Sequence, residues 1–425
     1  MVKIGILGVG TVGTSVAKIL EENADIIEAR AGKKIVVKSG VVKNLNKDRG
    51  VSIKISDNPL DVVDDPEIDI VVELMGGVDE PYALVKKALE NGKSVVTANK
   101  ALLAYHRYEL QEIAGDIPLM YEASTAGGIP IIGALRNGLS ANHIESIQGI
   151  MNGTCNYMLT NMINNGALYD DILKESQELG YAEADPTFDV GGFDASHKLL
   201  ILASIAYGID AKPEDILIEG IENITKTDVD FAKEFGYEIK SLGIAKKVKN
   251  EKVGDGVELR VHATMIPSES MIAKVDGVMN AVTVIGDRVG ETMYYGPGAG
   301  GDATASAVIS DIVDIVRGNQ GPMLGYKKGL ESGLKLLPKE EIVTQYYLRL
   351  EVADESGVLA TITTELGKFG ISIETMLQKP TTDEKIAQLL FTTHTCKESE
   401  MQEAIAALGK LDVVCGEIAM MRIEK

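Results

Sequence analysis

The sequence predicts an α/β protein with a doubly wound Rossmann-type parallel sheet, followed by an α+β domain and then a ferredoxin-like domain. Three observations predict this fold. A glycine-rich turn, GVGTVG at residues 8–13, joins an apolar run to a helical segment. Apolar β-branched runs alternate with helical segments through the first third of the chain. Residues 346–425 follow the order strand, helix, strand, strand, helix, strand, which is typical of a ferredoxin-like fold.

Residues 1–130 are predicted to form a dinucleotide-binding domain. Strands are expected at residues 3–7, 34–42, 68–74, 93–97 and 117–122, and helices at 11–28, 81–90 and 101–114. Because the strands are continuously apolar and β-branched, both faces of the sheet should be covered, as in parallel sheets. Right-handed crossovers between successive strands then give a doubly wound arrangement.

The pattern changes near Ile129, and residues 131–320 are predicted to form an α+β substrate domain. Helices are expected at 131–139, 160–165, 169–179 and 195–207, and strands at 144–149, 257–265 and 281–285. Residues 321–345 carry Gly, Pro and Lys and are expected to be a linker. In the last domain, residues 346–425, strands are expected at 346–352, 371–377, 386–393 and 413–421, and helices at 357–369 and 399–408.

Length, charge and cysteine content exclude several classes of protein. A chain of 425 residues, 45% of them hydrophobic, is expected to form two or three globular domains. A net charge of −21 argues against nucleic acid as a partner, because such a surface repels phosphate. No apolar run reaches the ~18 residues that span a membrane, and the N-terminal residues lack the marks of a signal peptide. The cysteines (Cys155, Cys396, Cys415) form no C-x-x-C pair, which argues against disulfides or structural zinc and favours a cytoplasmic location.

The glycine-rich turn predicts a nucleotide cofactor, NAD or NADP. Gly8 permits a tight turn, Gly10 lets the backbone approach a pyrophosphate, and Gly13 allows close packing of helix on strand. The N-terminus of the following helix supplies N–H donors and a positive dipole. The alternative is a Rossmann-like turn that has lost its cofactor.

The end of the second strand bears on the choice between NAD and NADP. An NAD-selective site usually has Asp or Glu there to hold the ribose 2′-hydroxyl, whereas this chain has Lys43. Lys43 could pair with a 2′-phosphate, which favours NADP or the use of both cofactors. The alternative is a solvated surface lysine.

Two lysines are candidate catalytic residues. Lys100 ends the segment TANK that follows the strand at 93–97, so it lies at the carboxyl edge of the sheet, where ligands bind. It could act near the nicotinamide or be only a residue at a helix N-terminus. Lys198 follows Asp194 by four residues on a helix that is apolar almost all round and therefore buried.

The pairing of Lys198 with Asp194 suits the oxidation of an alcohol. A lysine desolvated beside a carboxylate can exchange protons near neutral pH. The alternative is an ordinary surface ion pair, but burying two charges is costly without a reason. His197 points to a different face of the same helix and is expected to be a packing residue.

Acidic residues gather in the loop before this helix, GYAEADPTFD at residues 180–189. Glu183, Asp185 and Asp189 could form a divalent-cation loop, but their spacing is not that of an EF-hand and no histidine joins them. Binding a substrate ammonium is the favoured use of these carboxylates.

Together these motifs resemble those of homoserine dehydrogenases over nearly the whole chain. Besides the glycine turn, the shared segments are TANK at 97–100, NGTCN at 152–156, the 180–189 loop, GGFDASHK at 191–198 and GAGG at 298–301. The resemblance implies reversible NAD(P)-dependent interconversion of L-homoserine and L-aspartate 4-semialdehyde, in threonine, methionine and isoleucine biosynthesis. It also implies that the middle domain dimerises and that residues 296–318 rejoin the nucleotide-binding domain.

The resemblance carries roles over residue by residue. Lys198 resembles the family's proton-transfer lysine and Lys100 its second essential lysine. The residues that resemble substrate contacts are Glu183, Asp194, Gly153, Thr154 and Tyr181, the first two at the amino and hydroxyl ends of homoserine. Cofactor contacts are expected from Gly8, Gly10, Thr11, Val12, Gly13, Lys43, Thr97, Lys100, Gly180, Glu183 and Gly300.

The segment 122–129, EASTAGGI, resembles the family's monovalent-cation loop. There the Glu122 carboxylate and the backbone carbonyls of Thr125, Gly127 and Ile129 would bind sodium. From the residues alone, a Gly-rich turn between a strand and a helix is the simpler interpretation.

The C-terminal domain resembles an ACT domain. Residues 354–359 match the loop at which small amino acids bind between paired ACT domains, with Ser356 in place of a common proline. The resemblance implies threonine or another end-product amino acid as an allosteric effector, and a homodimer or homotetramer. The alternative is an ACT domain that serves only for assembly.

Two other functions compete with this one. Aspartate-semialdehyde dehydrogenase chemistry needs a thiolate nucleophile, for which Cys155 is the candidate near the predicted site. A non-catalytic nucleotide and amino-acid sensor could combine a Rossmann domain with an ACT domain, but a buried Asp194–Lys198 pair has no obvious purpose in a sensor.

Overall fold

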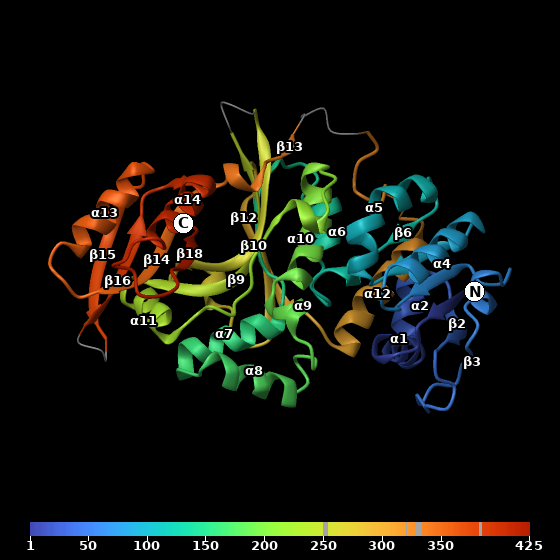
Figure 1. The fold of residues 1–425 in the computed structure, drawn as a ribbon. Helices are drawn as coiled ribbons and strands as arrows, with labels where there is room; N and C mark the ends of the chain where they lie inside the picture. Colours follow the sequence, from blue (N-terminus) through green and yellow to red (C-terminus); the bar gives the residue numbers. More distant parts are fainter. Residues whose placement is uncertain (250–253, 320, 329–333, 382–384) are drawn as a thin grey trace.

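A computed structural model of the chain describes residues 1–249, 254–319, 321–328, 334–381 and 385–425. They form three regions side by side: the blue N-terminal domain, a green and yellow middle domain, and the orange to red C-terminal domain (Figure 1). Among the described helices, none is long and apolar enough to cross a membrane.

The N-terminal domain is built on a six-stranded parallel sheet in the order β3-β2-β1-β4-β5-β6. The strands are β1 (Val2–Leu7), β2 (Ile35–Val41), β3 (Lys54–Ser56), β4 (Ile70–Glu73), β5 (Ser94–Thr97) and β6 (Leu119–Met120). The helices are α1 (Thr11–Glu22), α2 (Ala24–Ala31), α3 (Leu60–Val63), α4 (Asp79–Glu90) and α5 (Lys100–Ala114), joined by α12 (Gly301–Arg317), which packs against α1. The predicted doubly wound sheet is confirmed, with its strand order reversing between β1 and β4.

Several elements of this domain, including the unpredicted short helix α3, differ from the sequence prediction. The helix expected over 11–28 is interrupted at Asn23, whose φ of −106° and ψ of 24° are not helical; asparagine competes with the helix for backbone hydrogen bonds. The strand expected over 117–122 contains only Leu119–Met120, because a 3₁₀ helix begins at Glu122. The strand β3 was not predicted because it has only three residues and no apolar run.

The middle domain contributes to a twelve-stranded sheet whose main path is β12-β11-β7-β9-β10-β18-β14-β16-β15. Its strands are β7 (Ile144–Ile150), β8 (Leu217–Ile218), β9 (Tyr237–Val248), β10 (Gly256–Pro267), β11 (Met279–Gly286) and β12 (Gly290–Pro297). Its helices are α6 (Ile131–Gly133), α7 (Gly153–Asn165), α8 (Tyr169–Glu178), α9 (Thr187–Val190), α10 (Phe193–Tyr207) and α11 (Lys226–Glu234). Two expected helices differ in extent: 131–139 is a short α6 continued by a π-helical turn (Ala134–Gly138), and 160–165 is the end of the longer α7.

The C-terminal domain has the predicted order β14 (Val343–Ala353), α13 (Val358–Lys368), β15 (Ile373–Pro380), β16 (Ile386–Thr393), α14 (Glu398–Leu408) and β18 (Ala419–Ile423). The strand expected over 413–421 begins only at Ala419. β18 pairs antiparallel with β14 and parallel with β10, so the sheet continues from the C-terminal into the middle domain. In the expected linker, Lys335–Leu336 (β13) pairs with β10, while 329–333 lie outside the described residues.

The helix α10 is the element on which the site depends. It lies between the middle strands β9 and β10 and the helix α5 of the N-terminal domain (Figure 1). Nearly every side chain from Asp194 to Tyr207 is buried. A helix that is apolar almost all round is stable only when it is enclosed in this way. Its first turns therefore bring Asp194 and Lys198 to the boundary between the two domains.

Candidate active site

Two adjacent cavities follow the carboxyl edge of the parallel sheet, and Leu74 and Met75 line both of them. The first cavity, of about 280 Å³, lies where the N-terminal domain meets the middle domain. Val12, Lys100 and Lys198 are among its lining residues. Ligands of open α/β sheets bind at this edge, so the first cavity is the candidate reaction site.

The second cavity, of about 340 Å³, lies in front of the glycine turn and the end of β2. Gly8, Gly10 and Lys43 are among its lining residues. Lys43 is exposed, and the acidic Asp57 and Glu80 line the same cavity. The cavity therefore offers both a cation and carboxylates to the sugar end of a nucleotide.

Two glycines of the turn, Gly8 and Gly13, occupy positions where a side chain would obstruct it. A Cβ at Gly8, which has φ of 99°, would lie 2.6 Å from the carbonyl oxygen of Leu74. A Cβ at Gly13 would overlap the carbonyl oxygen of Gly8, whereas one at Gly10 would meet nothing within 4 Å. Gly10 stands at the N-cap of α1 and has no side chain that could bond the first N–H groups of the helix. The N–H groups of Thr11 and its neighbours are therefore available to an anion.

Asp194 is the centre of a buried ion cluster on the wall of the first cavity. Its Oδ2 accepts hydrogen bonds from Lys198 Nζ at 2.7 Å and from Asn152 Nδ2 at 2.8 Å, and its Oδ1 forms an ion pair with Lys100. Lys198 Nζ also donates to the carbonyl oxygen of Met151 at 2.6 Å. We call Asp194, Lys198, Lys100 and Asn152 the active-site cluster.

The charges of this cluster are unequal, because two amines share one carboxylate. Burial by itself raises the pKa of Asp194, but the charges of Lys198 and Lys100 outweigh it and hold that pKa well below its usual range. Burial lowers the pKa of Lys198; Asp194 opposes this shift and Lys100 adds to it. Lys198 can therefore lose its proton and leave a balanced Lys100–Asp194 pair behind.

The cluster brings together residues from three helices. Lys100 is the first residue of α5, whose cap residue Asn99 accepts a hydrogen bond from the N–H of Leu102 at 3.0 Å. Asp194 and Lys198 lie one turn apart on α10. Both lysines and Asp194 were predicted as site residues, but the sharing of one carboxylate by Lys100 and Lys198 was not predicted.

Asn152 has a role that the sequence analysis missed. It caps α7, with Oδ1 accepting from the N–H of Cys155 at 2.8 Å. Its Nδ2 donates to Asp189 Oδ1 and to Asp194 Oδ2, each at 2.8 Å. Asparagine before a helix is a recognised capping residue, so the NGTCN segment carried a signal for the cap but none for the bond to Asp194.

Glu73 was also missed; it directly precedes Leu74 and Met75, which line both cavities. It is the last residue of β4 and is fully buried. Its Oε1 accepts from the N–H of Met75 at 2.7 Å and its Oε2 from Thr97 Oγ1 at 2.5 Å. Burial raises the pKa of Glu73 to about 7, although these hydrogen bonds and Asn99 oppose the shift. The sequence signal was a carboxylate ending an otherwise apolar buried strand.

The expected substrate loop, residues 180–189, follows α8. It begins at Gly180, which has φ of 76°. The carbonyl oxygen of Tyr181 accepts from Thr154 Oγ1 at 2.7 Å, and its ring packs edge-on against Tyr157. Glu183 is exposed, and neither Glu183 nor Tyr181 is among the residues lining the two cavities.

Two further predicted glycines lie at helix N-termini that face the site. Gly153 is the first residue of α7, and a Cβ there would lie 2.7 Å from the carbonyl oxygen of Val278. Gly300 precedes α12 with φ of 125°. The neighbouring Gly301 packs against Thr11 of the glycine turn, where a Cβ would lie 3.3 Å from Thr11 Cγ2. These contacts join α12 to the cofactor turn.

The carboxylate of Glu122 is buried and bonded to the start of α6. Its two oxygens accept from the N–H groups of Ile132 at 2.8 Å and Gly133 at 2.7 Å. Its own N–H donates to Asp311 Oδ2 at 2.7 Å. Burial raises the pKa of Glu122, and the two N–H donors oppose that shift.

The rest of the expected cation loop is a tight turn. Ala126 has φ of 54° and is the one non-glycine residue with a positive φ in the part of the chain that the structure describes. Gly127 has φ of 53°. Thr125 and Ile129 are buried, and the Thr125 hydroxyl has no hydrogen-bond partner among the residues that the structure describes. Gly127 lines the first cavity. Strain of about 1–3 kcal/mol at a residue such as Ala126 persists only where the surroundings hold it.

Cys155 does not have the surroundings of a nucleophile. It is buried, and its Sγ donates to the carbonyl oxygen of Asp189 at 3.2 Å. Burial raises the pKa of the thiol, and the charges of Asp189 and Asp194 raise it further. A thiolate, which thioester chemistry requires, is therefore disfavoured here.

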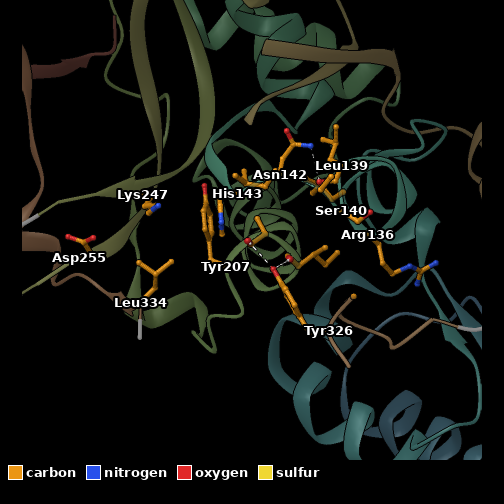
Figure 2. A pocket seen from close by; sticks show the side chains of 16 residues that line it. Arg136, Leu139, Ser140, Asn142, His143, Tyr207, Lys247, Asp255, Tyr326 and Leu334 are labelled. Carbon is orange, nitrogen blue, oxygen red and sulfur yellow. Dashed lines mark hydrogen bonds between the residues drawn. The ribbon is translucent and has the colours of Figure 1, made fainter. Parts of the chain in front are cut away.

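A third cavity, of about 670 Å³, lies away from the cluster (Figure 2). It is lined by Tyr207 and Tyr326 among others, near the C-terminal end of α10. The Tyr326 hydroxyl donates to the carbonyl oxygens of Ile205 and Ala206, at 2.6 and 3.1 Å. None of the predicted site residues is among the residues that line it.

Comparisons with known proteins agree along the whole chain. Family models match three segments: homoserine dehydrogenase over residues 130–313, the homoserine dehydrogenase NAD binding domain over 8–116, and the ACT domain over 346–413. Homoserine dehydrogenase of Helicobacter pylori is 55% identical, and the alignment covers 99% of this chain and 98% of that one. The structure of a homoserine dehydrogenase from Thiobacillus denitrificans has a TM-score of 0.94 at 47% identity and covers 100% and 98% of the two chains. A hyperthermophilic archaeal homoserine dehydrogenase in complex with NADPH has a TM-score of 0.62 at 28% identity and covers 74% and 97%.

Proposed function

The chain belongs to the homoserine dehydrogenase family, and on that premise we propose that Lys198 transfers the proton as it interconverts L-homoserine and L-aspartate 4-semialdehyde. The observation that carries the proposal is the position of the Lys198 amine, which lines the first cavity and is bonded to the buried Asp194. A sensor without chemistry would have no use for this amine, since removing it from water is costly.

In the oxidation direction, the neutral amine of Lys198 accepts the proton of the substrate hydroxyl. Burial favours this neutral form by lowering the pKa of Lys198. After transfer, the ammonium is stabilised by Asp194 Oδ2 and the carbonyl oxygen of Met151. When bound, NAD(P) accepts the hydride from the carbon that bore the hydroxyl. In the reverse direction, the Lys198 ammonium returns its proton to the aldehyde oxygen.

The other members of the site hold the substrate in position. We propose that Lys100 keeps Asp194 ionised when Lys198 is neutral, and that Asp194 orients the hydroxyl and the Lys198 amine together. Glu183 binds the substrate ammonium, a role supported by its exposed carboxylate on the loop that Thr154 ties to α7. Further substrate contacts come from Gly153, Thr154 and Tyr181.

Residues of the two adjacent cavities would hold the cofactor, with Lys198 available to the nicotinamide end in the first cavity and Lys43 to the adenosine end in the second. The uncapped N-terminus of α1 supports binding of the pyrophosphate there. Contacts are proposed from Gly8, Gly10, Thr11, Val12, Gly13, Thr97, Lys100, Gly180, Glu183 and Gly300. Lys43 favours NADP through a 2′-phosphate, consistent with the NADPH bound by the archaeal relative, whereas Asp57 and Glu80 keep NAD acceptable.

A sodium ion is proposed at the loop 122–129. The donors would be the Glu122 carboxylate and the carbonyls of Thr125, Gly127 and Ile129. The unpartnered Thr125 hydroxyl and the left-handed turn at Ala126 support a site built for a ligand. Oxygen-only donors with one carboxylate suit a hard monovalent cation. The bound cation would fix the loop wall that includes Gly127.

The ACT domain is proposed to bind threonine or another end-product amino acid, at residues 354–359. The effector would act on a homodimer or homotetramer in the cytoplasm, within threonine, methionine and isoleucine biosynthesis. Pairing of two ACT domains would build the effector site between them. This proposal rests on the match of residues 346–413 to the ACT family.

One assay tests the central proposal. Purified chain is mixed with L-homoserine and NAD or NADP, with and without threonine, and formation of reduced cofactor is followed. We expect turnover with at least one cofactor, and a loss of about 10²–10⁴-fold in the Lys198→Ala variant with cofactor binding retained. Near-normal turnover of Lys198→Ala would contradict the assignment.

A further inference from the structure

We propose that Glu73 is a positioning residue for the cofactor, holding the turn after β4 and the turn after β5 in one geometry through its two carboxyl oxygens. This inference rests on the proposed cofactor site. Glu73 does not line either cavity, so it acts through neighbouring residues rather than on the reactants.

The first of these turns is fixed through the backbone. Glu73 Oε1 accepts the N–H of Met75, two residues along the chain, at 2.7 Å. Leu74 and Met75 line both cavities, and the Leu74 carbonyl oxygen is the atom that a side chain at Gly8 would meet. The bond from Glu73 therefore fixes the Leu74–Met75 turn, which packs directly beside Gly8 of the glycine turn and lines both cavities.

The second turn is fixed through Thr97. Its hydroxyl donates to Glu73 Oε2 at 2.5 Å and accepts the N–H of Asn99 at 3.0 Å. Asn99 caps α5, and Lys100 of the active-site cluster is the next residue. A chain of hydrogen bonds thus runs from Glu73 to the helix end that carries Lys100.

The charge state of Glu73 gives this arrangement a measurable signature. An ionised carboxylate accepts at both oxygens, whereas a protonated one must donate at one of them. Burial raises the pKa of Glu73 to about 7. The groups facing it from β1, β5 and α5 are Leu7, Thr97 and Asn99, and no ion pair to Glu73 is found among the described residues. Both bonds are therefore complete only above about pH 7.

The sign of the stability effect separates positioning from a structural role. A carboxyl group whose pKa is raised by folding binds its proton more tightly in the folded state. Ionisation of Glu73 therefore makes the fold less stable as pH rises through the interval between its unfolded value and about 7. Glu73→Gln removes that effect, so the variant should be at least as stable as the parent at about pH 8.

The experiment measures NADPH affinity and thermal stability of the full chain, without homoserine. At about pH 8, we expect Glu73→Gln to weaken NADPH binding roughly three- to tenfold, the effect of one lost hydrogen bond, with Tm unchanged or higher. At about pH 6 the difference from the parent should shrink, because Glu73 is then protonated. Glu90→Gln, an exposed change at the end of α4, is the matched control and should leave both quantities unchanged.

Three outcomes would overturn the inference. The first is an NADPH affinity of Glu73→Gln at about pH 8 that equals that of the parent. The second is a loss of affinity that does not depend on pH, and the third is a loss of affinity accompanied by a fall in Tm. If Glu73→Gln does not fold, Glu73→Asp decides, because its shorter carboxylate cannot reach both the Met75 N–H and the Thr97 hydroxyl and should weaken NADPH binding to a similar extent. Absence of binding of both NADH and NADPH, or of homoserine oxidation with either cofactor, in the parent would instead refute the proposed function.

Discussion

The active-site cluster and a second cluster, built around a buried arginine at the junction of the middle and C-terminal domains, hold opposite excesses of charge. In the active-site cluster, two amines share the Asp194 carboxylate, and the Lys100 side chain is 34% exposed at the first cavity. In the junction cluster, which we define as Arg422, Glu219 and Glu398, two carboxylates share a guanidinium that is 0% exposed.

The bonds of Arg422 show what the junction cluster is built for. Its Nη1 and Nη2 donate to Glu219 at 2.7 and 2.9 Å, and its Nε and Nη2 donate to Glu398 at 2.8 and 2.6 Å. Glu398 begins α14 and Glu219 follows β8, so the three residues tie three elements together. Arginine stays protonated in proteins and fixes geometry, whereas a buried lysine shifts its pKa and can exchange its proton. The first cluster is therefore suited to the proton transfer proposed for Lys198, whereas the second holds elements of two domains together.

The largest expected effect comes from replacing a lysine of the active-site cluster with arginine, the residue on which the junction cluster is built. Lys198→Arg keeps the positive charge but removes a group that can lose its proton. We expect kcat for homoserine oxidation to fall about 10²–10⁴-fold, the usual contribution of a general base, while NADPH affinity stays within about twofold. Steady-state kinetics and a direct NADPH titration measure the two quantities. Activity close to that of the parent would show that Lys198 does not accept the proton.

The next effect comes from removing the guanidinium of the junction. Arg422→Ala leaves the Glu398 carboxylate buried without its cation, and breaking a buried pair in this way costs about 3–5 kcal/mol. Urea unfolding should report this loss in the free energy of unfolding. The matched control is Lys226→Ala, which breaks an exposed i,i+4 pair with Asp230 and should cost less than about 0.5 kcal/mol. Equal losses in the two variants would mean that the junction cluster stabilises no more than a surface pair.

The two clusters also differ in how far the sequence could predict them. Asp194 and Lys198 are four residues apart on one helix, and the apolar residues on almost all sides of that helix predicted that both would be buried. The partners of Arg422, Glu398 and Glu219, lie 24 and 203 residues away in the chain. Glu219 comes near because β18 and β8 both pair with β10, where Arg422 lies opposite Thr264. Such long-range strand pairing leaves no periodic signal. The sharing of Asp194 by Lys100 escaped prediction for the same reason, because Lys100 belongs to the other domain.

A third test asks whether the charge of Asp194 tunes Lys198. The Asp194 carboxylate raises the pKa of Lys198 against the lowering caused by burial. Asp194→Asn removes this charge, so the pKa of Lys198 should fall further and the inflection of kcat/KM with pH for homoserine oxidation should move to lower pH. The residual rate will be smaller, because the amine loses its orienting partner. A shift of the inflection to higher pH would contradict the arrangement of charges argued here.

The smallest effect is expected at Cys155, which touches the active-site cluster without sharing its chemistry. Its N–H donates to Asn152 Oδ1 and its thiol donates to the carbonyl oxygen of Asp189. Asn152 in turn donates to Asp194, so Asn152 links Cys155 to that carboxylate. Burial and the neighbouring carboxylates raise the pKa of the thiol and keep it protonated. Cys155→Ser retains a donor for the Asp189 carbonyl, and we expect kcat within about twofold of the parent, since a shape-conserving change at a satisfied hydrogen bond costs little. A loss comparable to that of Lys198→Arg would instead indicate a thiolate nucleophile, and the unequal sharing of Asp194 would no longer explain the chemistry.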